Sequence, residues 1–66
     1  MKNENVNEEA VLLLKYMADH NAHHAEELSE IAENLPENAA AHVREAVSLL
    51  NASTEKIREA IKETEI

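Results

Sequence analysis

Sixty-six residues allow a single domain, and fourteen acidic against six basic side chains give a net charge of −8. A chain this short buries little apolar surface and usually depends on a disulfide, a metal or a partner, and the absence of cysteine excludes the disulfide. The acidic charge disfavours nucleic acid and anionic membranes, and the longest apolar run, Val11 to Leu14, is too short to span a bilayer. The polar N-terminus does not resemble a secretory signal, so we expect a cytoplasmic protein.

The first predicted element is a helix over about residues 7–34, preceded by a polar lead-in at residues 1–5. Glycine is absent and proline occurs once, which favours helix throughout and no sheet. Asn7 before two acids is a good helix start, and Asn5 with Glu8 is the alternative. Apolar residues recur at spacings of three, four and seven and predict the packed face: Val6, Ala10, Leu13, Met17, Leu28, Ile31 and Leu35.

A turn at about residues 34–37 and a second helix at about residues 36–64 follow. Pro36 disfavours helical geometry at Leu35 and suits the first turn of the next helix. The second apolar stripe keeps its phase to the end: Ala39, Val43, Ala46, Val47, Leu50, Thr54, Ile57, Ile61 and Thr64. A break near Asn51 to Thr54, with Ser53 capping a third helix, is the alternative.

These elements predict an all-α protein, a single antiparallel two-helix hairpin over residues 1–66. Both apolar stripes are broader than one partner helix can cover. Two hairpins packed together would cover both stripes, so we expect a homodimer that forms a four-helix bundle.

The stripe on the first helix is polar at its middle, where His20, His24 and Glu27 share one surface. Two imidazoles four residues apart can bind one ion, and a carboxylate one turn later is a possible third ligand. Imidazole favours Zn, Ni, Co or Cu over Mg or Ca. The spacing therefore predicts a site for a divalent transition metal, in a carrier, sensor or store.

Four further polar residues are candidates for additional ligands or for hydrogen bonds behind the ligands. Asn21 and His23 adjoin the pair on the first helix. Counting from the turn, positions that sum to about 72 lie level, which brings Asn51 near the same height (estimated from hairpin geometry). His42 lies about two turns away on this count and is expected at the rim.

The stretch from His20 to Glu27 resembles H-N-x-x-H-A-x-E, a motif of small, largely uncharacterised helical hairpin domains of bacteria and archaea. The motif matches His20, Asn21, His24, Ala25 and Glu27. The resemblance implies that these residues act together, and it implies no reaction.

A non-catalytic explanation of the polar middle remains open, because a buried polar layer can serve only to fix the register of a dimeric interaction module. An enzyme is not expected. The chain has no nucleophile–base pair, no glycine-rich phosphate loop and too little length for a cleft.

Overall fold

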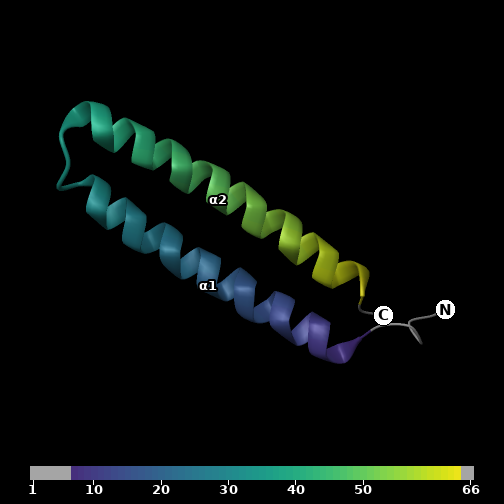
Figure 1. The fold of residues 1–66 in the computed structure, drawn as a ribbon. Coiled ribbons are helices and arrows are strands. Elements are labelled where there is room, and N and C mark those ends of the chain that lie inside the picture. Colours follow the sequence, from purple (N-terminus) through teal and green to yellow (C-terminus); the bar gives the residue numbers. More distant parts are fainter. Residues whose placement is uncertain (1–6, 65–66) are drawn as a thin grey trace.

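The computed structural model describes residues 7–64, which form two helices, α1 (Glu8–Ala32) and α2 (Glu37–Glu63). The helices lie side by side in an antiparallel hairpin, and the turn lies at one end of the molecule (Figure 1). The all-α hairpin is therefore confirmed, with helix bounds within two residues of those predicted. α2 continues without interruption through residues 51–54, so the alternative interpretation, a break with Ser53 capping a third helix, is wrong. The lead-in at residues 1–5 and Val6 lie outside the described residues.

Local signals explain where α1 begins and where the chain turns. The side-chain oxygen of Asn7 accepts a hydrogen bond from the backbone N–H of Ala10 at 3.1 Å. At the other end of α1, the side-chain amide of Asn34 donates a hydrogen bond to the backbone carbonyl of Glu30 at 3.3 Å. Pro36 has an extended ψ of 154°, and its carbonyl accepts the first bond of α2, from Ala40 N–H at 2.8 Å.

Replacing Asn7 with alanine should lower the free energy of unfolding by about 1 kcal/mol, because the first turn of α1 loses its capping acceptor. Urea unfolding followed by helical circular dichroism measures the change. Asn7→Asp is the matched control and should retain most of the stability, since its carboxylate also accepts from this turn. Equal losses in the two variants would show that the cap is not the cause.

The interface between the two helices is built on small side chains of α1. Three alanines at a spacing of seven, Ala18, Ala25 and Ala32, are buried there. α2 contributes residues in the same repeat, of which Ala40, Thr54 and Ile61 are buried and the larger Val43, Val47, Leu50 and Ile57 half-buried. We call this interface the alanine seam. Small residues on one helix let the larger ones on the other approach its backbone closely.

The prediction that Leu13, Met17 and Ile31 pack against the second helix is wrong, because all three are more than half exposed. α1 carries a stripe that includes large apolar residues and, beside it, a seven-residue repeat of alanines. The alanine repeat faces α2, since the large side chains needed to fill the interface come from α2 itself. Of the part of the predicted face that lies within residues 7–64, only Leu28 and Leu35 are half-buried.

Candidate metal site on α1

Three exposed apolar residues of α1, Leu13, Met17 and Ile31, share one surface with the predicted metal ligands His20, His24 and Glu27. On a helix with about 100° per residue, all of them lie within about 60° of His24. We call this surface the histidine stripe: Leu13, Met17, His20, His24, Glu27 and Ile31. It runs along the outside of the hairpin, so the polar middle predicted for the interface between α1 and α2 lies instead on the surface. Figure 1 shows α1 and α2 side by side along their length.

His20 and His24 point their ring nitrogens at each other. Their Nε2 atoms lie 3.0 Å apart, and the ring centroids are 4.3 Å apart at an interplanar angle of 76°. The other ring nitrogen of His24, Nδ1, lies 3.3 Å from Oε1 of Glu27. An ionised carboxylate only accepts hydrogen bonds, so Nδ1 of His24 carries the proton and its Nε2 is a lone-pair acceptor when the ring is neutral. His20 then donates its Nε2 proton to His24.

Glu27 holds a second imidazole with its other oxygen. His23 Nε2 lies 3.3 Å from Oε2 of Glu27, one turn along the helix. Glu27 thus contacts His24 at the ring nitrogen that faces away from His20, and it links His24 to His23. All three side chains are at least half exposed, so these contacts are modest in energy and easily rearranged.

The geometry of the histidine pair suits two ligands of one ion. Two imidazole nitrogens at about 2.1 Å from a metal, with an angle of 90–109° between them, are about 3.0–3.4 Å apart. The proton now shared by the two Nε2 atoms lies where the ion would bind. Glu27 contacts the opposite ring nitrogen and is not a third donor at this point. Within residues 7–64, no group of three or more His or acidic side chains is arranged to hold a metal.

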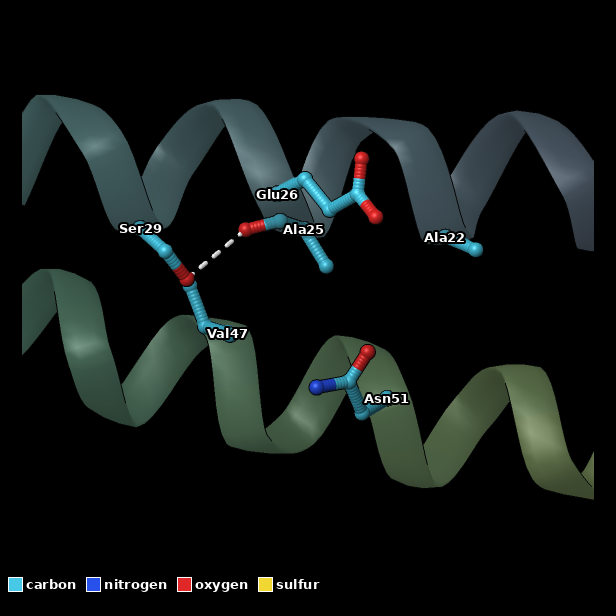
Figure 2. Close-up of a pocket in the computed structure, with 6 residues that line it drawn as sticks. All are labelled: Ala22, Ala25, Glu26, Ser29, Val47 and Asn51. Atoms are coloured by element: carbon cyan, nitrogen blue, oxygen red, sulfur yellow. Dashed lines mark hydrogen bonds between the residues drawn. The ribbon is translucent and has the colours of Figure 1, made fainter.

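The other predicted candidates do not gather around this pair. Asn21 is half-buried toward the alanine seam. Asn51 lines a cavity of about 240 Å³ between the helices, together with Ala22, Ala25, Glu26, Ser29 and Val47 (Figure 2). Ala22 and Glu26 are each two residues from His24, so their side chains leave the helix about 160° away from that of His24. The cavity therefore lies on the flank of the hairpin opposite His24. His42 is exposed on α2. It lies two helical turns closer than Leu49 to the connection between the helices.

Two side chains near the stripe were not predicted to matter. The ring of Tyr16 stacks on His20, with centroids 5.6 Å apart and an interplanar angle of 13°. Its spacing of four from His20 is the signal that predicts such a contact. Leu49 of α2 is the most exposed of the large apolar residues, at 68%. A surface leucine has no sequence signal beyond its phase on the helix.

Comparison with known proteins places the chain in a family without a known activity. Neither α1 nor α2 is long and apolar enough to cross a membrane. No curated protein and no solved structure gives a significant match to the chain. Residues 10–64, which include both helices almost entirely and the whole histidine stripe, match a family described as a domain of unknown function, DUF8180. The chain therefore belongs to the DUF8180 family.

Proposed function

We propose that the chain is a small protein that binds a divalent transition metal through the imidazoles of His20 and His24. The observation that carries the proposal is the 3.0 Å separation of their Nε2 atoms, with Glu27 on the opposite nitrogen of His24. The same arrangement, a ligating imidazole whose other nitrogen donates to a carboxylate, recurs in metal sites. Carriage, sensing or storage of the ion fits a chain with this site and no catalytic group beside it.

Glu27 is assigned a supporting role in this proposal. Its contact with Nδ1 fixes the tautomer in which His24 Nε2 is free to bind a metal. His20 contributes its Nε2 after its proton moves away, and Tyr16 restricts the ring from one side. The resemblance of the surrounding residues to the H-N-x-x-H-A-x-E motif supports a shared role for His20, His24 and Glu27.

Calorimetric titration of the protein with Zn, Ni, Co and Cu at neutral pH tests the proposal. We expect at least one ion to bind with a Kd below about 100 µM, because two preorganised imidazoles bind better than two independent ones. Failure of all four ions to reach this affinity would refute the proposal. Zn and Ni differ in preferred geometry, so their relative affinities report on how many further ligands the ion finds.

The second candidate function is a non-catalytic interaction module. The observation that favours it is the row of large apolar residues on the histidine stripe, which a monomer leaves in water. In this function the histidines fix only the register of the contact. Replacing His20 and His24 by other polar residues would then leave assembly unchanged and remove no bound ion.

A further inference from the structure

We infer that the face of the hairpin that carries the histidine stripe is a self-association surface, and that its occupant is a second copy of this chain packed antiparallel on a two-fold axis at the level of Ala22 and Leu49. The inference deepens the proposed function, because the second copy supplies the ligands that one hairpin lacks. Its test is nevertheless independent of metal.

The face is free of charged side chains where the two helices adjoin on this side of the molecule. α1 contributes a seven-residue repeat of exposed positions here, and α2 contributes another. The eight residues are Ala10, Met17, His24, Ile31, Ala39, Ala46, Ser53 and Ala60. None is Asp, Glu, Lys or Arg, although 30% of the chain is. We call these eight positions, together with Leu13, His20 and Leu49, the uncharged face, and Glu27 of the histidine stripe lies at its edge, about 60° from His24.

The opposite flank has different chemistry, which excludes it as an equivalent surface. It carries the cavity beside Asn51 (Figure 2) and an ion-pair contact between Arg58 and Asp19 at 4.0 Å across the helices. Charged side chains at the edge of a contact keep it solvated, whereas depletion of charge marks the core of an interface. The hairpin therefore has one flank suited to water and one suited to a partner.

The order of residues along α1 is self-complementary in the antiparallel direction. If two copies of α1 cross at Ala22, Leu13 lies opposite Ile31 of the second copy, and His20 lies opposite His24 of the second copy. Leu13 and Ile31 then meet at the two ends and the imidazoles meet near the axis, while Glu27 lies opposite Met17 at the edge of the contact. A two-fold axis requires this kind of match, since each contact occurs twice.

α2 gives the same axis independently. When two copies of α2 cross next to Leu49, the small residues of its repeat pair with one another, Ala39 with Ala60 and Ala46 with Ser53. Leu49 then meets Leu49 of the second copy, which accounts for its 68% exposure in one hairpin. Ala22 and Asn51 line one cavity, so the two crossing points lie at nearly the same level.

The size of the face is sufficient for a stable dimer. The hairpin measures 52 by 15 Å in its two longer dimensions, an area of roughly 800 Å², which equals the area of about 800 Å² per partner in a standard interface. Burial of the exposed Leu13, Met17, Ile31 and Leu49 supplies the apolar part of the contact. The pairing also places two His20–His24 pairs at the axis, which gives up to four imidazoles in one layer.

Sedimentation equilibrium in the presence of a strong chelator tests the surface without metal. We expect the native chain to be a dimer and Leu49→Glu to weaken its dimerisation by about 100-fold, because two carboxylates would meet on the axis. Leu12→Glu is the matched control. Leu12 is 67% exposed but lies about 120° from His24, off the uncharged face, so its substitution should leave the dimer unchanged. A monomeric native chain, or equal effects of the two substitutions, would overturn the inference.

Oxidative cross-linking tests the register in a chain that has no natural cysteine. Leu49→Cys should form a disulfide-linked dimer with itself, because the residue lies on the axis, and Leu12→Cys should not. Leu13→Cys and Ile31→Cys should cross-link only when the two variants are mixed. Cross-linking of Leu13→Cys with itself would contradict the antiparallel register. A chelator-resistant dimer that binds no metal would refute the proposed function and leave this inference standing.

Discussion

Replacing His24 with alanine should weaken metal binding by at least about 100-fold, which is the upper range for loss of a group that only supports a ligand. His24 contributes the Nε2 lone pair that needs no change of tautomer to bind an ion, and it lies 3.0 Å from the second donor. Its loss leaves His20 as a single imidazole. Titration calorimetry with the tightest of the four ions measures the difference.

Two further substitutions distinguish the effect of losing a metal ligand from the effect of changing a residue that does not bind the ion. Glu27→Gln should weaken binding by about 10-fold, since an amide oxygen still accepts from Nδ1 of His24 but carries no charge. His42→Ala should leave the affinity unchanged, because His42 lies on α2 away from the pair. The order His24, Glu27, His42 is the expected result. An equal loss in all three would indicate non-specific binding to surface imidazoles.

Replacing Ala18 with leucine should lower the free energy of unfolding by about 1–3 kcal/mol, through overpacking of the alanine seam. Ala18 is 2% exposed and, unlike Ala25, does not line the cavity between the helices, so three more carbon atoms fit there only if the helices move apart. Urea unfolding at a fixed protein concentration measures the change, because association also contributes to stability.

Ala52→Leu is the matched control for this substitution. Ala52 is exposed on α2, and alanine and leucine have similar helix propensities. Its effect should stay within about 0.5 kcal/mol. If Ala18→Leu were as stable as the control, the helices would not be held together by close contact at the alanine seam.

The fold was predictable because its signals are local. Asn7 caps α1 as its side-chain chemistry predicts, and Pro36 places the turn within one residue of the prediction. The proximity of His20, His24 and Glu27 was equally accessible, since spacings of three and four on one helix fix it. Ser53 did not cap a third helix, because the apolar phase of α2 is favoured over one capping residue.

The orientation of α1 was not predictable from the same pattern. Leu13, Met17 and Ile31 have larger apolar side chains than Ala18, Ala25 and Ala32, so hydrophobicity alone selects them as the core face. Whether α2 packs on that face or on Ala18 and Ala25 depends on the size of the side chains facing across the interface. The role of Glu27 was also beyond the sequence, because it depends on which ring nitrogen its carboxylate contacts.

The alanine seam also affects the heat capacity change of unfolding, and with it the dependence of stability on temperature. A core of methyl groups from Ala18, Ala25 and Ala32 exposes less apolar area to water on unfolding than a core of leucines. The heat capacity change of an isolated hairpin should therefore fall below the usual value of about 12–15 cal/mol/K per residue. A small heat capacity change flattens the curve of stability against temperature. Cold denaturation then moves to lower temperature.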